Sequence, residues 1–358
     1  MSASSLLWIG IVVAAFPLFA QQQPIPAPPA APVNADSRIT LDVVANDKSG
    51  SPIANLSQQD FTVLDNKQPQ KIISFQALGQ TSTDSGVEIV LVVDAVNTSF
   101  TRVAYVREEL DKFLRQENGK LAWPVSIAIL LDSGLQMQNE PSRDGNALAA
   151  LLDGRTTGLR TLTRSQGFYG AVERSQLSFR ALEQLAAQEE KRPGRKLVIW
   201  ISPGWPLLSG PAVNLSSKDQ QNIFNSVVEI STQLRHSRMA VYMVDPLGAE
   251  DSIRTFYYEQ FLKPVTAPKQ AQFGNLALQV FAIHSGGRVL TSNSDIAGQI
   301  ERCVHDANTY YALSFEPPAS EPGPYHAIEV KLSQKQLKAQ TLSGYYGQPA
   351  TNTHALNR

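Results

Sequence analysis

The chain has 358 residues, of which 42% are hydrophobic and 18% charged, with 22 glycines, 22 prolines and one cysteine. This length predicts roughly two domains, and the apolar fraction is ordinary for a globular protein, which argues against long-range disorder. Lys and Arg number 31 against 32 Asp and Glu, a formal net charge of −1. The composition therefore lacks the basic surplus that nucleic-acid or anionic-membrane binding needs. The single thiol, Cys303, excludes an intrachain disulfide framework and a cysteine-rich zinc site.

The N-terminal residues predict an export signal. Leu6 to Phe19 form an apolar run that has the length of a signal-peptide core and is short for a membrane span. Ala20 is small enough for signal peptidase, so residues 1–20 are predicted to be a cleaved signal. Because no Lys or Arg precedes the run, an uncleaved anchor is the alternative; no cysteine follows it, which excludes a lipoprotein anchor. We expect an exported protein, periplasmic or extracellular, with no integral membrane segment after cleavage.

The next segments predict a linker and then a small β module. Residues 21–37 are rich in Pro, Ala and Gln, a composition that cannot bury enough apolar surface to fold. Apolar and polar residues alternate from Ile39 to Ala45, and two more short strands follow within residues 38–80. About forty residues are too few for a stable domain. We therefore expect this module to find partner strands elsewhere in the chain.

Residues 86–309 alternate between strand and helix patterns. Nearly continuous apolar runs, typical of strands buried on both faces, occur at 87–96, 125–131, 197–201 and 239–244. Helical spacing follows at 100–114, 169–188, 217–234, 276–283 and 296–308, and Ser217 with Gln220 predicts a capping box for the third of these helices. This alternation predicts an α/β domain with a doubly wound, mainly parallel sheet and helices on both faces.

Strand patterns return after residue 309. They occur at 310–315, 325–332 and 340–346. We expect residues 310–347 to pair with residues 38–80 in a small β-sandwich-like module, with the α/β domain inserted between its halves. The alternative is that the terminal strands extend the edge of the α/β sheet. Residues 348–358 are predicted to be a disordered tail.

These elements resemble a von Willebrand factor type A domain. The resemblance rests on a buried strand, Val87–Val93, that ends in Asp94, on the later buried strands and on the closing helix. The flanking segments Val43–Phe75 and Tyr310–Tyr346 are similar to those of the bacterial exported VWFA-related family. The resemblance covers roughly residues 38–347. It implies a Rossmann-like fold whose function lies in the upper loops, at the carboxyl ends of the parallel strands.

The resemblance also implies a metal-ion-dependent adhesion site, in a degenerate form. Type A domains commonly bind Mg²⁺ through Asp-x-Ser-x-Ser, a Thr in a second loop and an Asp in a third, since a hard cation needs oxygen ligands. In this chain Val96 takes the place of the first serine, Gln166 that of the threonine, and Pro203 that of the aspartate. We expect no cofactor, with Mg²⁺ as the alternative. Candidate metal ligands are Asp94, Asn97, Thr98 and Ser165.

A structural role is the alternative for the first loop. Asp94, Asn97 and Thr98 follow a strand and precede a helix, so any of them could cap that helix.

The loop that follows the third buried strand suits a partner. Trp205, Leu207 and Leu208 in a loop are costly to expose without one, and aromatic anchors are enriched at interfaces. The alternative is that these side chains fold down as a lid over the degenerate metal site. The candidate partner-binding residues are Gln166, Ser202, Pro203, Gly204, Trp205, Leu207 and Leu208.

The sequence shows few features that are typical of an enzyme. The five histidines form no H-E-x-x-H spacing, and neither G-x-S-x-G nor a phosphate-binding G-x-x-x-x-G-K-[ST] occurs. Cys303 shares an apolar stripe with its helical neighbours, which favours a buried, inert thiol. We expect a non-enzymatic exported module, for adhesion or envelope scaffolding, whose partner is another protein. Divalent-cation-dependent adhesion and a hydrolase with an unrecognised site are the alternatives.

Overall fold

The computed structural model describes seven stretches of the chain. The predicted signal (1–20), the linker (21–37) and the tail (348–358) lie outside the described residues. Within the described part, no helix combines the length and apolarity that crossing a bilayer requires. The described stretches are 38–79, 86–156, 167–208, 214–246, 257–291, 294–318 and 325–347.

A seven-stranded sheet runs through the centre of the described residues, in the order β11-β10-β9-β5-β6-β7 with β8 paired to β6. The strands β11, β10, β9, β5 and β6 are parallel, and β7 and β8 are antiparallel to β6. Since β5 lies between β6 and β9, the direction of winding reverses at β5, which makes a switch point. The bounds are β5 Val87–Asp94, β6 Lys120–Leu131, β7 Gly134–Met137, β8 Ser142–Asp144, β9 Arg195–Ile201, β10 Met239–Val244 and β11 Val289–Leu290.

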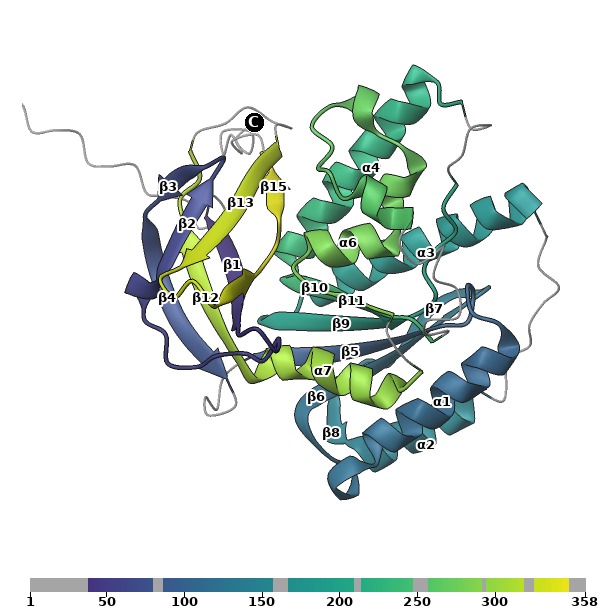
Figure 1. Cartoon of the computed structure of the whole chain (residues 1–358). Helices are drawn as coiled ribbons and strands as arrows, with labels where there is room; N and C mark the ends of the chain where they lie inside the picture. The colour runs from purple at the N-terminus through teal and green to yellow at the C-terminus, as the bar shows by residue number, and fades with distance from the viewer. Residues whose placement is uncertain are drawn as a thin grey trace, which may run out of the picture. The chain divides into compact units, whose positions relative to one another are not determined.

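Helices cover both faces of this sheet (Figure 1). One face carries α1 Phe100–Leu114, α2 Gly145–Thr156 and α7 Ile296–Asn308, and the other carries α3 Gly167–Glu189, α4 Ser217–His236 and α6 Leu278–His284. The described part of the chain is thus mixed α/β, with a mainly parallel sheet between two helical layers. Short 3-10 helices are η2 Gln58–Asp60, η3 Gln116–Gly119, η5 Tyr257–Phe261, η6 Pro268–Gln270 and η7 Phe273–Leu276.

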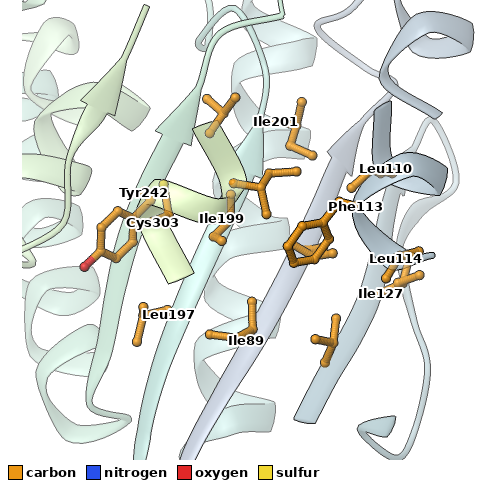
Figure 2. Close-up of a cluster of buried hydrophobic side chains, with 14 of the residues drawn as sticks. Ile89, Leu110, Phe113, Leu114, Ile127, Leu197, Ile199, Ile201, Tyr242 and Cys303 are labelled. Carbon is orange, nitrogen blue, oxygen red and sulfur yellow. The ribbon is translucent and has the colours of Figure 1, made fainter. Parts of the chain in front are cut away.

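Both faces of the central strands are buried, which is why their sequences are almost wholly apolar. In β5, Ile89 and Leu91 belong to the core beneath α1 and α7, whereas Val90 and Val92 belong to the core beneath α3 and α6. Figure 2 shows the first of these cores, with Cys303 of α7 inside it. Burial raises the pKa of the Cys303 thiol well above its usual range, so the thiol stays protonated and unreactive.

A second pair of sheets is built from the two ends of the chain. The first sheet has the order β14-β1-β12-β4 and the second β15-β13-β2-β3, with antiparallel pairing throughout. The terminal strands therefore pair with one another and not with the edge of the seven-stranded sheet. The bounds are β1 Ile39–Asn46, β2 Phe61–Asp65, β3 Gln68–Gln70, β4 Ile72–Gly79, β12 Thr309–Phe315, β13 Tyr325–Leu332, β14 Lys338–Gln340 and β15 Gly344–Tyr346.

The two terminal sheets, called the sandwich below, share one apolar core. Leu41 and Val43 of β1 and Leu313 of β12 contribute from one sheet, and Phe61 and Val63 of β2 from the other. Each of the two sheets thus contains strands from both ends of the described chain. Neither end can therefore complete this core alone.

One helix cap differs from the sequence prediction. The capping box of α4 is made by Ser216 and Asp219, not by Ser217 and Gln220. The Ser216 hydroxyl accepts a hydrogen bond from the Asp219 backbone N–H at 3.2 Å, and the Asp219 carboxylate accepts one from the Ser216 backbone N–H at 3.1 Å. An aspartate thus fills the role that Glu or Gln usually takes.

Candidate functional site

The candidate site lies at the switch point, where β5 and β9 end side by side. Asp94 is the last residue of β5 and is fully buried. One of its oxygens, Oδ1, accepts hydrogen bonds from the backbone N–H groups of Val96 at 3.0 Å and Asn97 at 2.8 Å. The carboxylate therefore fixes the turn that leads from the strand into α1.

The other oxygen of Asp94 joins this turn to the neighbouring strand. Oδ2 accepts hydrogen bonds from the Asn97 amide at 2.8 Å, the Trp200 indole N–H at 3.1 Å and the Ser202 hydroxyl at 2.9 Å. The Asn97 amide also donates to the hydroxyl of Ser178, in α3, at 2.8 Å. A carboxylate offers about four lone-pair positions, and here five donors occupy its two oxygens. The chain itself satisfies this charge.

As arranged, these side chains do not fit a Mg²⁺ site. An octahedral cation needs free oxygen ligands, but the only charged candidate, Asp94, has both oxygens held by N–H and O–H donors. Two other oxygens remain at this point: Asn97 Oδ1 and Thr98 Oγ1 are buried and have no hydrogen-bond partner among the described residues. Ser165 lies outside the described residues. Across the described stretches, no group of three or more His, Cys, Asp or Glu is placed to hold a metal ion.

The loop after β9 folds over this edge, as in the lid alternative, and does not project from it. Trp205 is buried, with its ring centroid 5.4 Å from that of Trp200 and 6.2 Å from that of Phe281 in α6. Leu208 is also buried, and Leu207 packs against an apolar cluster that includes Phe261. An exposed Trp205 anchor is therefore not what the structure has, because α6 supplies an apolar surface that covers the loop.

The backbone of this loop needs a glycine. Gly204 has a φ of +96°, and a Cβ atom there would lie 2.4 Å from the amide nitrogen of Gln279 in α6. The Gly204 N–H donates to the Ser202 hydroxyl at 3.2 Å. Pro203, between them, is partly exposed. Gln166, the remaining candidate for partner binding, lies outside the described residues.

Exposed aromatic side chains lie at the starts of the helices that flank this edge. Phe168 and Tyr169 begin α3 and are 54% and 83% exposed, with ring centroids 6.1 Å apart. Phe100 begins α1 and is 58% exposed. The sequence pattern predicts Phe100 and Tyr169 only as helix positions, and Phe168 precedes the predicted helix at 169–188. The available signal was two adjacent aromatics at a helix start, outside the periodic apolar face.

The first turns of α3 project beyond the sheet. Ser178, which contacts Asn97 at the end of β5, comes eleven residues after Gly167, and eleven helical residues span about 16 Å. Figure 1 shows the first turns of α3 reaching past the ends of the strands. Phe168 and Tyr169 are therefore carried away from the buried Asp94 network.

No protein-family model matches the chain. No characterised protein matches its sequence.

Some solved structures match the chain at low TM-scores. The human COPII-coat protein Sec24c matches at 11% identity and a TM-score of 0.33, over 76% of this chain and 46% of that one. The pilus adhesin SpaC from Lactobacillus rhamnosus GG, in its open conformation, matches at 9% identity and a TM-score of 0.39, over 84% and 49%. The minor pilin PilB from Streptococcus sanguinis matches at 11% identity and a TM-score of 0.33, over 63% of each chain. The chain spans about half the length of the first two.

A buried cluster of charges lies at the opposite, amino-terminal edge of the sheet. Glu189 ends α3 and is fully buried, and Arg192 Nη1 donates to it at 3.4 Å and to Glu88 of β5 at 3.0 Å. Burial, and secondly the charge of Glu88, raises the pKa of Glu189 to about 6 from an ordinary 4.5. This carboxyl therefore binds its proton more tightly in the folded chain than in the unfolded one.

We expect Glu189→Gln to stabilise the fold at neutral pH. Because the pKa of Glu189 is higher in the folded chain than in the unfolded one, its bound proton stabilises the fold. This contribution to the free energy of unfolding is fully present below pH 4.5 and is lost as pH rises through about 6. The corresponding free energy is about 2 kcal/mol. Urea denaturation between about pH 4 and 8 should show a flatter profile for Glu189→Gln than for the wild type. The exposed neighbour gives the control, Glu190→Gln, which should follow the wild type; parallel profiles for all three proteins would contradict this assignment.

Proposed function

We propose that this chain is a non-enzymatic, exported protein-binding module of von Willebrand A-like architecture, which contacts its partner at the carboxyl edge of the seven-stranded sheet. The observation that carries this proposal is the exposed pair Phe168 and Tyr169 on the projecting start of α3. Large aromatic side chains lose apolar surface to water when a partner covers them, and tyrosine is enriched among the residues that dominate binding energy. Phe100, exposed at the start of α1, adds to this surface.

Binding at this edge would not use a bridging cation. Asp94, the charged residue of the first loop, is held by five hydrogen bonds within the chain. The network instead joins β5, β9 and α3. Trp200 lies near the end of β9, Ser202 directly follows this strand, and Ser178, bonded to Asn97, belongs to α3. We assign it the role of positioning α3, so that the exposed aromatic pair is presented by a rigid element.

The aromatic pair gives the first test. We expect the double variant Phe168→Ser/Tyr169→Ser to lose at least about tenfold in affinity for the captured partner, because hot-spot truncations cost about 2 kcal/mol or more each. The measurement is a pull-down from an envelope extract of the source cells, followed by titration of the captured protein. Ile73→Ser, at an apolar residue of the sandwich that is also exposed, is the matched control and should bind normally.

Each part of the proposal has an outcome that overturns it. If the double variant captures the same proteins at the same affinity, the aromatic pair is not part of the interface. If the protein is recovered only in the cytoplasmic fraction, it is not exported. Turnover of an ester or a peptide in a broad panel by the purified chain would favour the hydrolase alternative.

A second candidate, divalent-cation-dependent adhesion, has one observation in its favour. Asn97 Oδ1 and Thr98 Oγ1 are buried oxygens without a hydrogen-bond partner among the described residues, and these residues follow Asp94 by three and four positions in the chain. Partner capture that requires Mg²⁺, is abolished by EDTA and is lost in Thr98→Val would support this candidate over the metal-free one. Capture in EDTA equal to that in Mg²⁺ would exclude it.

A further inference from the structure

The chain has a large pocket far from the switch point, where the α/β layer meets the sandwich. Its walls come from α4, η5 and α6, from the first residues of β9 and β10, and from β1, β13 and β15 of the sandwich. Arg195 and Met239 in its lining are the first residues of β9 and β10. The pocket therefore lies at the amino-terminal edge of the sheet, opposite the Asp94 network.

Hydrogen bonds between the sandwich and the α4–α6 layer fix the walls of this pocket. The backbone N–H of Ser343 donates to the carbonyl oxygen of His284 at 3.0 Å. The Tyr346 hydroxyl donates to the Val265 carbonyl at 2.9 Å, and the Gln340 amide donates to the Gly286 carbonyl at 2.8 Å. Since these bonds tie the sandwich strands to the α4–α6 layer, the walls are formed before any ligand arrives.

The lining is strongly cationic for its size. Four cationic side chains, those of Arg195, Arg235, Arg238 and Lys263, line the pocket, against one carboxylate, that of Asp42. Arg238 uses that carboxylate, since its Nε donates to Asp42 Oδ2 at 3.1 Å and its Nη2 donates to Oδ1. The other three cations are left without an acidic partner among the described residues.

Arg235 is the cation best placed to hold a ligand. Its side chain is half-buried in α4, and its one hydrogen bond within the described residues joins Nη2 to the ring of the neighbouring His236, at 2.7 Å. Burial lowers the pKa of Arg235, and the smaller opposing effect comes from the Tyr345 phenol and not from a carboxylate. A guanidinium withdrawn from water without a counter-ion is costly, and an anion with two parallel acceptors would remove that cost.

The rest of the lining is apolar. Val227, Leu234, Met239, Val265 and Phe281 are all buried and face this space. The space between these walls measures about 890 Å³ with the open mouth included. Inorganic anions gain nothing from such walls, whereas an apolar body loses its contact with water there.

His284 does not compete for the anion. Its Nδ1 lies 2.9 Å from the Ser343 hydroxyl and its Nε2 lies 3.1 Å from the Leu262 carbonyl. Burial lowers the pKa of His284, so the ring is neutral at physiological pH and both of its nitrogens are engaged by the chain.

We propose that this pocket binds an organic carboxylate with an apolar body, the carboxylate on Arg235 with Lys263 beside the mouth, and the body against the apolar wall. This inference goes beyond the proposed function, because the pocket and the aromatic pair lie at opposite edges of the sheet. The ligand is a small molecule, and the site is independent of any protein partner.

Octanoate is a suitable probe. Titration calorimetry of the purified chain with octanoate, below the concentration at which it forms micelles, should show saturable binding of one molecule per chain. Octan-1-ol, which has the same body without the charge, and inorganic phosphate, which has the charge without the body, should each bind at least about tenfold more weakly. Equal binding of the alcohol, or no binding of octanoate at millimolar concentration, would overturn the proposal.

Variants identify the cation. Arg235→Gln should weaken octanoate binding by a factor of about 10 to 100, the range for a hydrogen bond to a charged group. This substitution leaves no carboxylate without its partner, so the variant should fold, which its melting curve checks. Lys263→Gln, at an exposed position, should weaken binding by a smaller factor. Arg180→Gln, on α3 and outside the lining, should have no effect, and Phe168→Ser/Tyr169→Ser should bind octanoate normally. Unchanged affinity in Arg235→Gln would overturn the assignment.

Discussion

Replacing Asp94 with alanine is expected to destabilise the fold by about 3 to 5 kcal/mol, because each buried donor that loses its acceptor costs about 1 to 3 kcal/mol. The Asp94 carboxylate accepts hydrogen bonds from the side chains of Asn97, Trp200 and Ser202 and from two backbone N–H groups. Val96, Trp200 and Ser202 are buried and Asn97 is partly buried, so most of these donors would lose the carboxylate without gaining water in its place. Urea denaturation in EDTA measures the loss.

This result separates a structural carboxylate from a metal ligand. A ligand carboxylate kept without its cation is an uncompensated charge, so removing it leaves the metal-free protein as stable as before or more stable. Here the metal-free protein should lose stability, and millimolar Mg²⁺ or Mn²⁺ should not raise the melting temperature of the wild type. Asp94→Asn, which retains one acceptor oxygen, should give an intermediate loss.

A carboxylate of α1 supplies the control for Asp94. Asp111 is partly exposed and pairs with Arg115 on the helix surface at 2.8 Å, so Asp111→Ala should cost no more than about 0.5 kcal/mol. If Asp94→Ala behaves like Asp111→Ala in EDTA while Mg²⁺ stabilises the wild type, the hydrogen-bond network is not the role of Asp94, and the cation-dependent alternative gains.

The sequence indicates the strands of the central sheet well, because a strand buried on both faces must be apolar at nearly every position. Val87–Val93 is such a run, and β5 occupies it. The sequence patterns did not predict one helix and two short strands. α2 spans Gly145–Thr156 but has glycines in its pattern, and β7 and β8 are three or four residues each, too short for a period to stand out.

The site was harder to predict than the fold. That Asp94 ends a buried strand is visible in the sequence, but its partners Trp200, in β9, and Ser202, directly after β9, are more than a hundred residues away. Their proximity depends on β5 lying beside β9 in the sheet, which local patterns do not specify. For the same reason local sequence patterns do not predict the burial of Trp205, because the side chain that covers it is Phe281, in α6. Long-range neighbours decide both outcomes.

A second buried carboxylate, Asp306 of α7, joins the α/β layer to the sandwich. It is fully buried and accepts hydrogen bonds from Arg288 Nε at 3.1 Å and Nη2 at 2.8 Å, and from the Tyr242 hydroxyl at 2.9 Å. The amide of Gln340, in β14 of the sandwich, donates to it at 3.0 Å. One carboxylate thus links α7, β10 and a strand of the sandwich.

We expect Asp306→Ala to cost about 3 to 5 kcal/mol, since breaking a buried ion pair from one side leaves the other charge uncompensated. Arg288 would keep its guanidinium in a site that is only partly open to water, and the buried Tyr242 hydroxyl would lose its acceptor. Urea denaturation at neutral pH, monitored by circular dichroism and by tryptophan fluorescence, measures the change. Glu301→Ala, at an exposed residue of the same helix, is the control and should stay within about 0.5 kcal/mol of the wild type.

The double variant Arg288→Met/Asp306→Ala, compared with Asp306→Ala, separates the cost of the unpaired Arg288 charge from the loss of packing at residue 306. Removing both charges leaves neither of them unpaired, so this variant should be more stable than Asp306→Ala, even though it changes one more buried residue. In both proteins the Tyr242 hydroxyl lacks the Asp306 acceptor and the Gln340 amide keeps the Gly286 carbonyl, so any difference between the two variants comes from Arg288→Met. If the double variant is instead less stable than Asp306→Ala, the shape of the site matters more than the pairing. A loss in Asp306→Ala no larger than that in Glu301→Ala would show that the sandwich does not depend on this link.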